Sequence, residues 1–76
     1  MLTPEIVYSN HKIKKDYLVC LRITNKWHVV ECHDNPADAC EQRDSLATDA
    51  LISGLISDPL FYQVFHKNFV EIKELQ

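Results

Sequence analysis

The chain has 76 residues, enough for one domain with a single small core, and 46% of them are hydrophobic while 25% are charged. Eleven acidic against eight basic residues give a formal net charge of −3, which disfavours proteins that coat nucleic acids or bind anionic membranes by charge alone. No apolar run reaches the ~20 residues that span a bilayer. Residues 1–15, an N-terminal segment that we expect to be partly ordered, lack the apolar core of a signal peptide. The number of cysteines, three, is odd, and the sequence therefore predicts a cytoplasmic protein with free thiols. Of these, Cys32 and Cys40 are expected to react slowly until the chain is unfolded.

Two paired strands are predicted in the first half of the chain. Residues 17–24 and 27–32 are rich in β-branched and aromatic side chains, and Asn25-Lys26 between them suits a tight turn. This loop places Ile23 opposite His28. The predicted inner face then consists of Val19, Leu21, Ile23, Val30 and Cys32. The predicted outer face consists of Leu18, Cys20, Arg22, Trp27, Val29 and Glu31.

A helix is predicted from Pro36 to the neighbourhood of Gly54. Asn35 suits the N-cap, proline suits the first helical position, and Asp38 complements the helix dipole. Gly54, the only glycine, can take the left-handed conformation that ends helices. Arg43 falls within the apolar arc, and we expect its stem to pack while its head reaches solvent. The arc itself consists of Ala39, Cys40, Leu46, Ala47, Ala50 and Leu51.

The remaining strands define the predicted fold. Residues 61–66 read as a third strand, and residues 69–75 as a fourth that returns after a turn at Lys67-Asn68. Residues 5–8 add a short N-terminal strand. The result is an α+β domain over residues 1–76, with a β-β-α-β-β order, a mainly antiparallel sheet and one helix packed on one face.

Residues 26–40 contain many potential metal ligands, namely two cysteines, two histidines and three acidic residues. On a strand, however, His28 and Cys32 lie about 13 Å apart, whereas zinc holds its ligand atoms at ~2.0–2.3 Å. No Cys-x-x-Cys pair supplies a second half-site, and one glycine excludes a glycine-rich phosphate loop. We therefore predict no metal, no cofactor and no catalytic residue. A metal or redox module around Cys32 and Cys40 remains one alternative.

Two surfaces suit contact with another protein. One is the outer sheet face, which either exposes an apolar patch around Trp27, a residue type enriched at binding hot spots, or is covered by a second, thinner core made by the N-terminal segment. The other is the outward face of the helix, whose carboxylates complement a basic partner. The leading hypothesis is a non-enzymatic interaction module that binds another protein or a second copy of itself. Its candidate contact residues are Leu18, Trp27, Val29, Glu31, Asp38, Glu41 and Asp49.

The order of elements resembles that of small phage-encoded anti-CRISPR proteins. It is carried by the stretches DYLVCL, WHVVE, NPADA and FYQVF, within residues 16–75. The likeness lies in length and element order, and it carries over no functional residue. It implies a non-enzymatic inhibitor that blocks a basic nucleic-acid-binding surface of a host defence complex by direct contact.

A second alternative is a small nucleic-acid-binding regulator. Residues 11–15 contain Lys12, Lys14 and Lys15, and Tyr8 and Tyr17 flank this basic segment. Aromatic side chains beside basic loops can stack on exposed bases.

We predict that binding to mixed-sequence DNA or RNA is weak at physiological salt, because three clustered lysines neutralise few phosphates. The measurement is a fluorescence anisotropy titration with labelled oligonucleotides. Tight binding that is lost when Lys12, Lys14 and Lys15 are replaced together by glutamine would favour the regulator instead.

Overall fold

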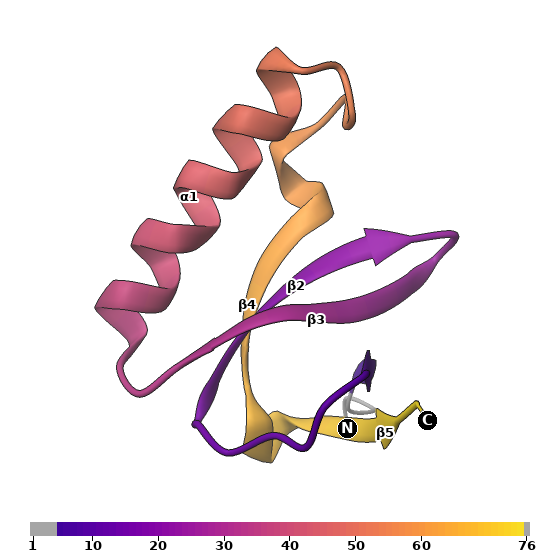
Figure 1. Cartoon of the computed structure of the whole chain (residues 1–76), viewed down its shortest axis with the longest axis vertical. Coiled ribbons are helices and arrows are strands. Elements are labelled where there is room, and N and C mark those ends of the chain that lie inside the picture. The colour runs from indigo at the N-terminus through magenta and orange to yellow at the C-terminus, as the bar shows by residue number, and fades with distance from the viewer. Residues whose placement is uncertain (1–4, 76) are drawn as a thin grey trace.

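The chain forms a five-stranded mixed sheet with one helix packed against it (Figure 1). The computed structural model describes residues 5–75. The sheet order is β4-β2-β3-β1-β5. The strands are β1 (Glu5–Ser9), β2 (Tyr17–Ile23), β3 (Lys26–His33), β4 (Tyr62–His66) and β5 (Val70–Glu74). The helix is α1 (Pro36–Ile52), and two short 3-10 helices are η1 (Pro59–Phe61) and η2 (Lys67–Phe69).

The α+β class is confirmed, but the mainly antiparallel β-β-α-β-β layout is wrong. The predicted N-terminal strand exists and lies inside the sheet, parallel to both β3 and β5. The predicted hairpin at Lys67-Asn68 does not form, because η2 carries the chain from β4 at one edge of the sheet to β5 at the other. The backbone N–H of Asn68 donates to Nδ1 of His66 over 3.1 Å at the start of this turn. Parallel pairing places Val7 between Trp27 and Ile72, so burial of these side chains favours the observed order.

The turn between β2 and β3 lies one residue earlier than predicted. Thr24 and Asn25 have φ of 50° and 65°, the pattern of a two-residue type I′ hairpin loop. Threonine is unfavourable there because it is β-branched. Ile23 pairs with Lys26 instead of His28, and a bulge between Val19 and Cys20 shifts the register again. The predicted pairing of the two strands is therefore wrong.

The register determines which side chains of β2 and β3 lie on each face of the sheet. Trp27 and Val29, predicted to lie on an outer face, pack against a core in which Val7, Leu18 and Cys20 are fully buried. The Trp27 ring meets the Phe65 ring edge-on, at 5.2 Å between centroids. Of the two readings of this face, the exposed apolar patch is wrong, and the core made with the N-terminal segment is confirmed. Val7 of β1 and Ile13 of the loop before β2 belong to this core together with residues of β5. The other partly buried members of this core are Ile13, Cys32, Val70 and Ile72.

A second, thinner core lies between the sheet and α1. Successive strand residues face opposite sides, so Val19 points away from Leu18 and Cys20, yet it is also fully buried. The helix supplies the cover through small side chains, with Ala39, Ala47 and Ala50 buried. The sheet is thus covered on both faces.

The helix boundaries follow the predicted local signals. Asn35 is the N-cap, and its side-chain oxygen accepts the backbone N–H of Asp38 at 2.8 Å. Pro36 opens the helix, Ser53 caps its end, and Gly54 follows with a φ of +75°. The predicted apolar arc is partly wrong, because Cys40 and Leu51 are exposed.

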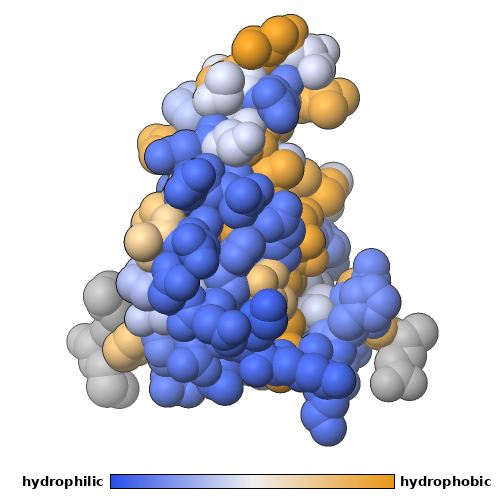
Figure 2. Space-filling model, turned by 60° about the vertical axis from the view of Figure 1, so that its left-hand side comes forward, coloured by the Kyte–Doolittle hydropathy of each residue, from blue (hydrophilic) through white to orange (hydrophobic). Residues whose placement is uncertain are grey.

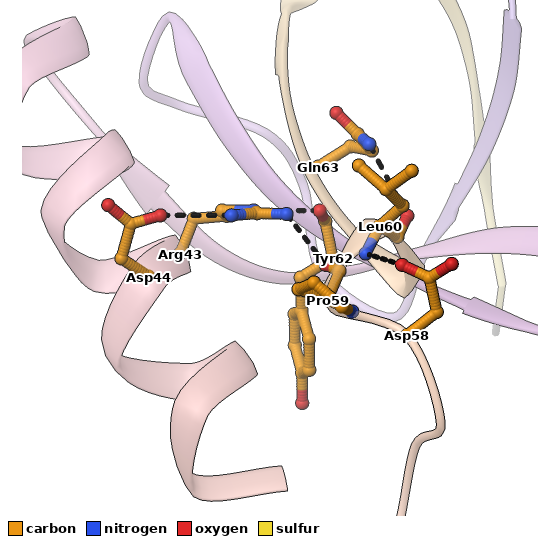
Figure 3. A network of polar contacts seen from close by, with 7 residues as sticks. All are labelled: Arg43, Asp44, Asp58, Pro59, Leu60, Tyr62 and Gln63. Atoms are coloured by element: carbon orange, nitrogen blue, oxygen red, sulfur yellow. Dashed lines mark hydrogen bonds and ion pairs between the residues drawn. The ribbon is translucent and has the colours of Figure 1, made fainter. Parts of the chain in front are cut away.

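Arg43 occupies the middle of the buried stripe of α1 and bonds to the backbone at the edge of the sheet (Figure 3). Its Nε donates to the Tyr62 carbonyl at 2.8 Å, and Nη2 donates to the Pro59 carbonyl at 2.6 Å. Nη1 donates to the Asp44 carboxylate at 2.9 Å. Only 21% of the Arg43 side chain is exposed, and all three nitrogens of its head donate to protein oxygens instead of being free in solvent. The guanidinium joins α1 to the start of β4.

We predict that Arg43→Met lowers the free energy of unfolding by ~2–3 kcal/mol, because two carbonyls lose a charged donor while the apolar stem is kept. Arg43→Lys should restore part of this loss, since one ammonium cannot reproduce the fork of the guanidinium. Urea denaturation measures both. Arg22→Met is the matched control, because Arg22 makes one exposed bond to Asn25. An Arg43→Met loss no larger than that of the control would contradict the anchoring role.

Candidate functional site

The strand pairing separates the cysteines from the histidines. Tyr17 lies opposite both His33 and His66, whereas Leu18 lies opposite Cys32. Because neighbouring residues face opposite sides, Cys32 and Cys20 share one face while His33 and His66 share the other. His33 Nε2 instead lies 2.9 Å from the Glu31 carboxylate. Within residues 5–75, neither Cys20 nor Cys32 is therefore placed beside His33 or His66 for nucleophilic chemistry.

The metal or redox module proposed around Cys32 and Cys40 is not assembled either. Cys32 packs in the core on the side of the sheet away from α1, and Cys40 is exposed on α1. Across residues 5–75, no three His, Cys, Asp or Glu side chains are grouped so that they could hold a metal ion.

The basic segment of the nucleic-acid alternative forms part of the loop between β1 and β2, with Lys12, Lys14 and Lys15 all exposed. The two flanking tyrosines are engaged elsewhere. Tyr8 lies against the ring of His28 at 5.7 Å, and Tyr17 meets His66 edge-on at 4.9 Å between centroids. The structure does not gather these lysines and tyrosines into one stacking surface.

A shallow hollow of about 580 Å³ lies between the start of β1 and the turn of the β2–β3 hairpin. Its wall carries both signs of charge, so it selects no single class of ligand. Its lining residues are Glu5, Ile6, Tyr8, Arg22, Asn25, Lys26 and Trp27.

The outward face of α1 is acidic, as predicted from the sequence. Asp38, Glu41 and Asp49 are all exposed there. Residues 34–58 contain six acidic residues and one basic residue, Arg43, whereas the rest of the chain contains five acidic and seven basic residues. Arg43 turns toward β4, and its guanidinium donates hydrogen bonds to two carbonyls and to the carboxylate of Asp44. The helix layer therefore presents uncompensated negative charge.

At the C-terminal end of α1, large apolar side chains are exposed. We name Ile52, Leu55 and Leu60 the apolar tip; their exposed fractions are 81%, 80% and 61%. Figure 2 shows hydrophilic side chains over the front of the molecule, where α1 lies, and apolar side chains at the top and down the right-hand flank. Leu51 is exposed beside them.

Local hydrogen bonds fix the apolar tip in place. The N–H of Leu55 donates to the Ala50 carbonyl at 2.9 Å, and that of Gly54 to the Leu51 carbonyl at 3.1 Å, the two bonds of a Schellman motif. In such motifs the residue at the position of Leu55 usually packs back on the helix, yet here it faces solvent. On η1, the Asp58 carboxylate accepts the N–H of Leu60 at 2.8 Å.

The apolar tip was missed in the sequence, although a signal was present. The run ALISGLIS around Gly54 contains more large aliphatic residues than one helical stripe can bury. The predicted outer-sheet residues Leu18, Trp27 and Val29 lie in the core instead, and Glu31 bonds to His33. Within residues 5–75, no helix is both long and apolar enough to cross a membrane.

We predict that the three thiols react in the order Cys40, Cys32, Cys20. Burial, with a smaller contribution from Cys32, raises the pKa of Cys20 to about 12, and burial raises that of Cys32 against the opposing effect of Lys15. Cys40 is exposed, so the sequence-based expectation that it reacts slowly is corrected. Alkylation followed by mass spectrometry between pH 7 and pH 9 measures the order. Rapid native labelling of Cys20 would contradict the buried position.

The same pKa shift affects stability in alkali. The unfolded Cys20 thiol releases its proton near its ordinary pKa of 9.0, whereas the folded one holds it up to about 12. The unfolded chain then binds fewer protons, so the contribution of Cys20 to stability is complete below pH 9 and declines as the pH rises toward 12. In Cys20→Ala, the part of the decline in stability between pH 9 and pH 12 that comes from this thiol should be absent.

No family model, no curated protein and no solved structure matches the chain.

Proposed function

We propose that this chain is a non-enzymatic protein-interaction module that binds its partner through the apolar tip and the acidic face of α1. The observation that carries the proposal is the exposure of Ile52, Leu55 and Leu60. Covering one such side chain fully contributes roughly 1.5–3 kcal/mol. Ile52 and Leu55 are held by the end of α1 and Leu60 by η1, so a partner that covers all three gains this contribution from each.

The acidic face adds orientation to this anchor. Asp38, Glu41 and Asp49 lie on one helix, over eleven residues and therefore about 16 Å. Charges arranged in this way steer association and fix the register more than they add affinity. The partner surface that suits them is basic.

Within this class we propose an inhibitor of the anti-CRISPR type, acting in the cytoplasm. The acidic face of α1 supports this, because it can occupy a basic surface that otherwise binds nucleic acid. Blocking by contact requires no cofactor and no catalytic group. It requires only that the module be bound tightly enough to exclude the nucleic acid.

The test uses a photocrosslinking amino acid at position 55, with position 30 as the matched control. Val30 is also exposed, by 44%, but lies on β3. We expect partner crosslinks from position 55 in a lysate of bacteria that carry defence complexes, with the partner identified by mass spectrometry. Ile52→Ser should weaken capture about 30-fold if Ile52 is a hot spot of ~2 kcal/mol. Crosslinks from position 30 alone would contradict the proposal.

The inhibitory part has its own readout. The captured complex is purified and its binding to nucleic acid is measured with and without the module. We expect competition that Ile52→Ser relieves and Val30→Ser does not. If the nucleic-acid binding of the partner is unaffected, the chain is an interaction module but not an inhibitor of this kind.

A further inference from the structure

We infer that the partner segment seated on the apolar tip is basic and amphipathic, with large apolar side chains next to lysines or arginines. The inference rests on the proposed function and names the chemistry of its partner. It is based on the negative charge around the apolar tip. Asp49 lies one helical turn before Ile52, and Asp58 lies two residues before Leu60. Residues 44–66 contain no lysine or arginine.

The acidic rim disfavours the other occupants of an apolar surface. A second copy would bring its own Asp49 and Asp58 against the same residues of the first, and like charges across an interface cost several kcal/mol. Anionic lipid and nucleic acid are repelled for the same reason. A basic protein segment is the occupant for which the apolar and the electrostatic contributions have the same sign.

The structure also gives the spacing of charges in this segment. Ile52 lies three residues after Asp49, so the first cation belongs about 5 Å along the axis from the apolar anchor. Further cations belong up to about 21 Å away, where Asp38 lies. Among these carboxylates, that of Asp38 also accepts a bond from the Asn35 side chain at 2.8 Å. Arg43, turned inward, leaves this whole row unneutralised.

The experiment titrates the full chain with three synthetic peptides of equal length, about 18 residues, and follows backbone amide shifts by NMR. The first peptide is an amphipathic helix of leucine and lysine. The second replaces lysine by glutamate, and the third keeps the lysines but replaces leucine by serine and glutamine. We expect the first peptide to shift the amides of residues 49–60 and to bind about tenfold or more tightly than either of the others.

Two variants and a control assign the effect. Ile52→Ser with Leu55→Ser should abolish the preference for leucine, and Asp49→Asn with Asp58→Asn should abolish the preference for lysine over glutamate. Asparagine keeps an oxygen that can accept the N–H of Leu60. Ile23→Ser, at a residue 45% exposed on the β2–β3 hairpin, is the control and should change neither preference.

Three results would overturn the inference. These are equal binding of the leucine-glutamate peptide, shifts that leave residues 49–60 unchanged, and self-association in sedimentation that Ile52→Ser abolishes. The proposed function is judged separately by the crosslink at position 55. A captured protein with an acidic contact segment would retain the interaction module and reject the basic partner, whereas no capture at all would reject the module itself.

Discussion

The contact on which the arrangement of this protein depends is the one between Arg43 and the backbone at the start of β4. Alanines make a helix–sheet contact with little area, so α1 needs a further attachment to keep its orientation. The guanidinium supplies it by donating hydrogen bonds to the carbonyls of Pro59 and Tyr62, which lie sixteen and nineteen residues after Arg43 in the sequence. By turning the one positive charge of the helix layer inward, the same contact leaves the outer face of α1 acidic. Attachment and surface charge therefore have a common origin.

How well the sequence predicts each part of this fold depends on how far apart along the chain the interacting residues lie. The limits of α1 follow from neighbouring residues, Asn35-Pro36 at the start and Gly54 at the end, and both were predicted. The hairpin register was not, because it depends on Thr24 adopting a conformation that β-branched residues disfavour and on a bulge in β2–β3 pairing. The parallel pairing of β1 with β5 joins distant segments, and no local pattern indicates it.

The candidate site shows the same division. The acidic face was predictable because helical periodicity alone places Asp38, Glu41 and Asp49 together. The burial of Trp27 was one of two alternatives that the sequence left open, since it depends on strands brought together from both ends of the chain. The apolar tip lies between these cases. Its residues are close in sequence, but their exposure depends on where the sheet ends beneath α1.

The pairing of β1 with β5 has a consequence for how the chain folds. Glu5 lies opposite Val70, so the first and last described strands are neighbours in the sheet. Contacts between such distant residues carry a high entropic cost before they become favourable, which slows folding. The β2–β3 hairpin and α1 can form early from local contacts, but Val7 and Trp27 are not covered until β5 arrives. A chain that is extended or truncated at β5 should therefore populate a longer-lived folding intermediate in which this core is exposed to solvent. Such intermediates are prone to aggregate.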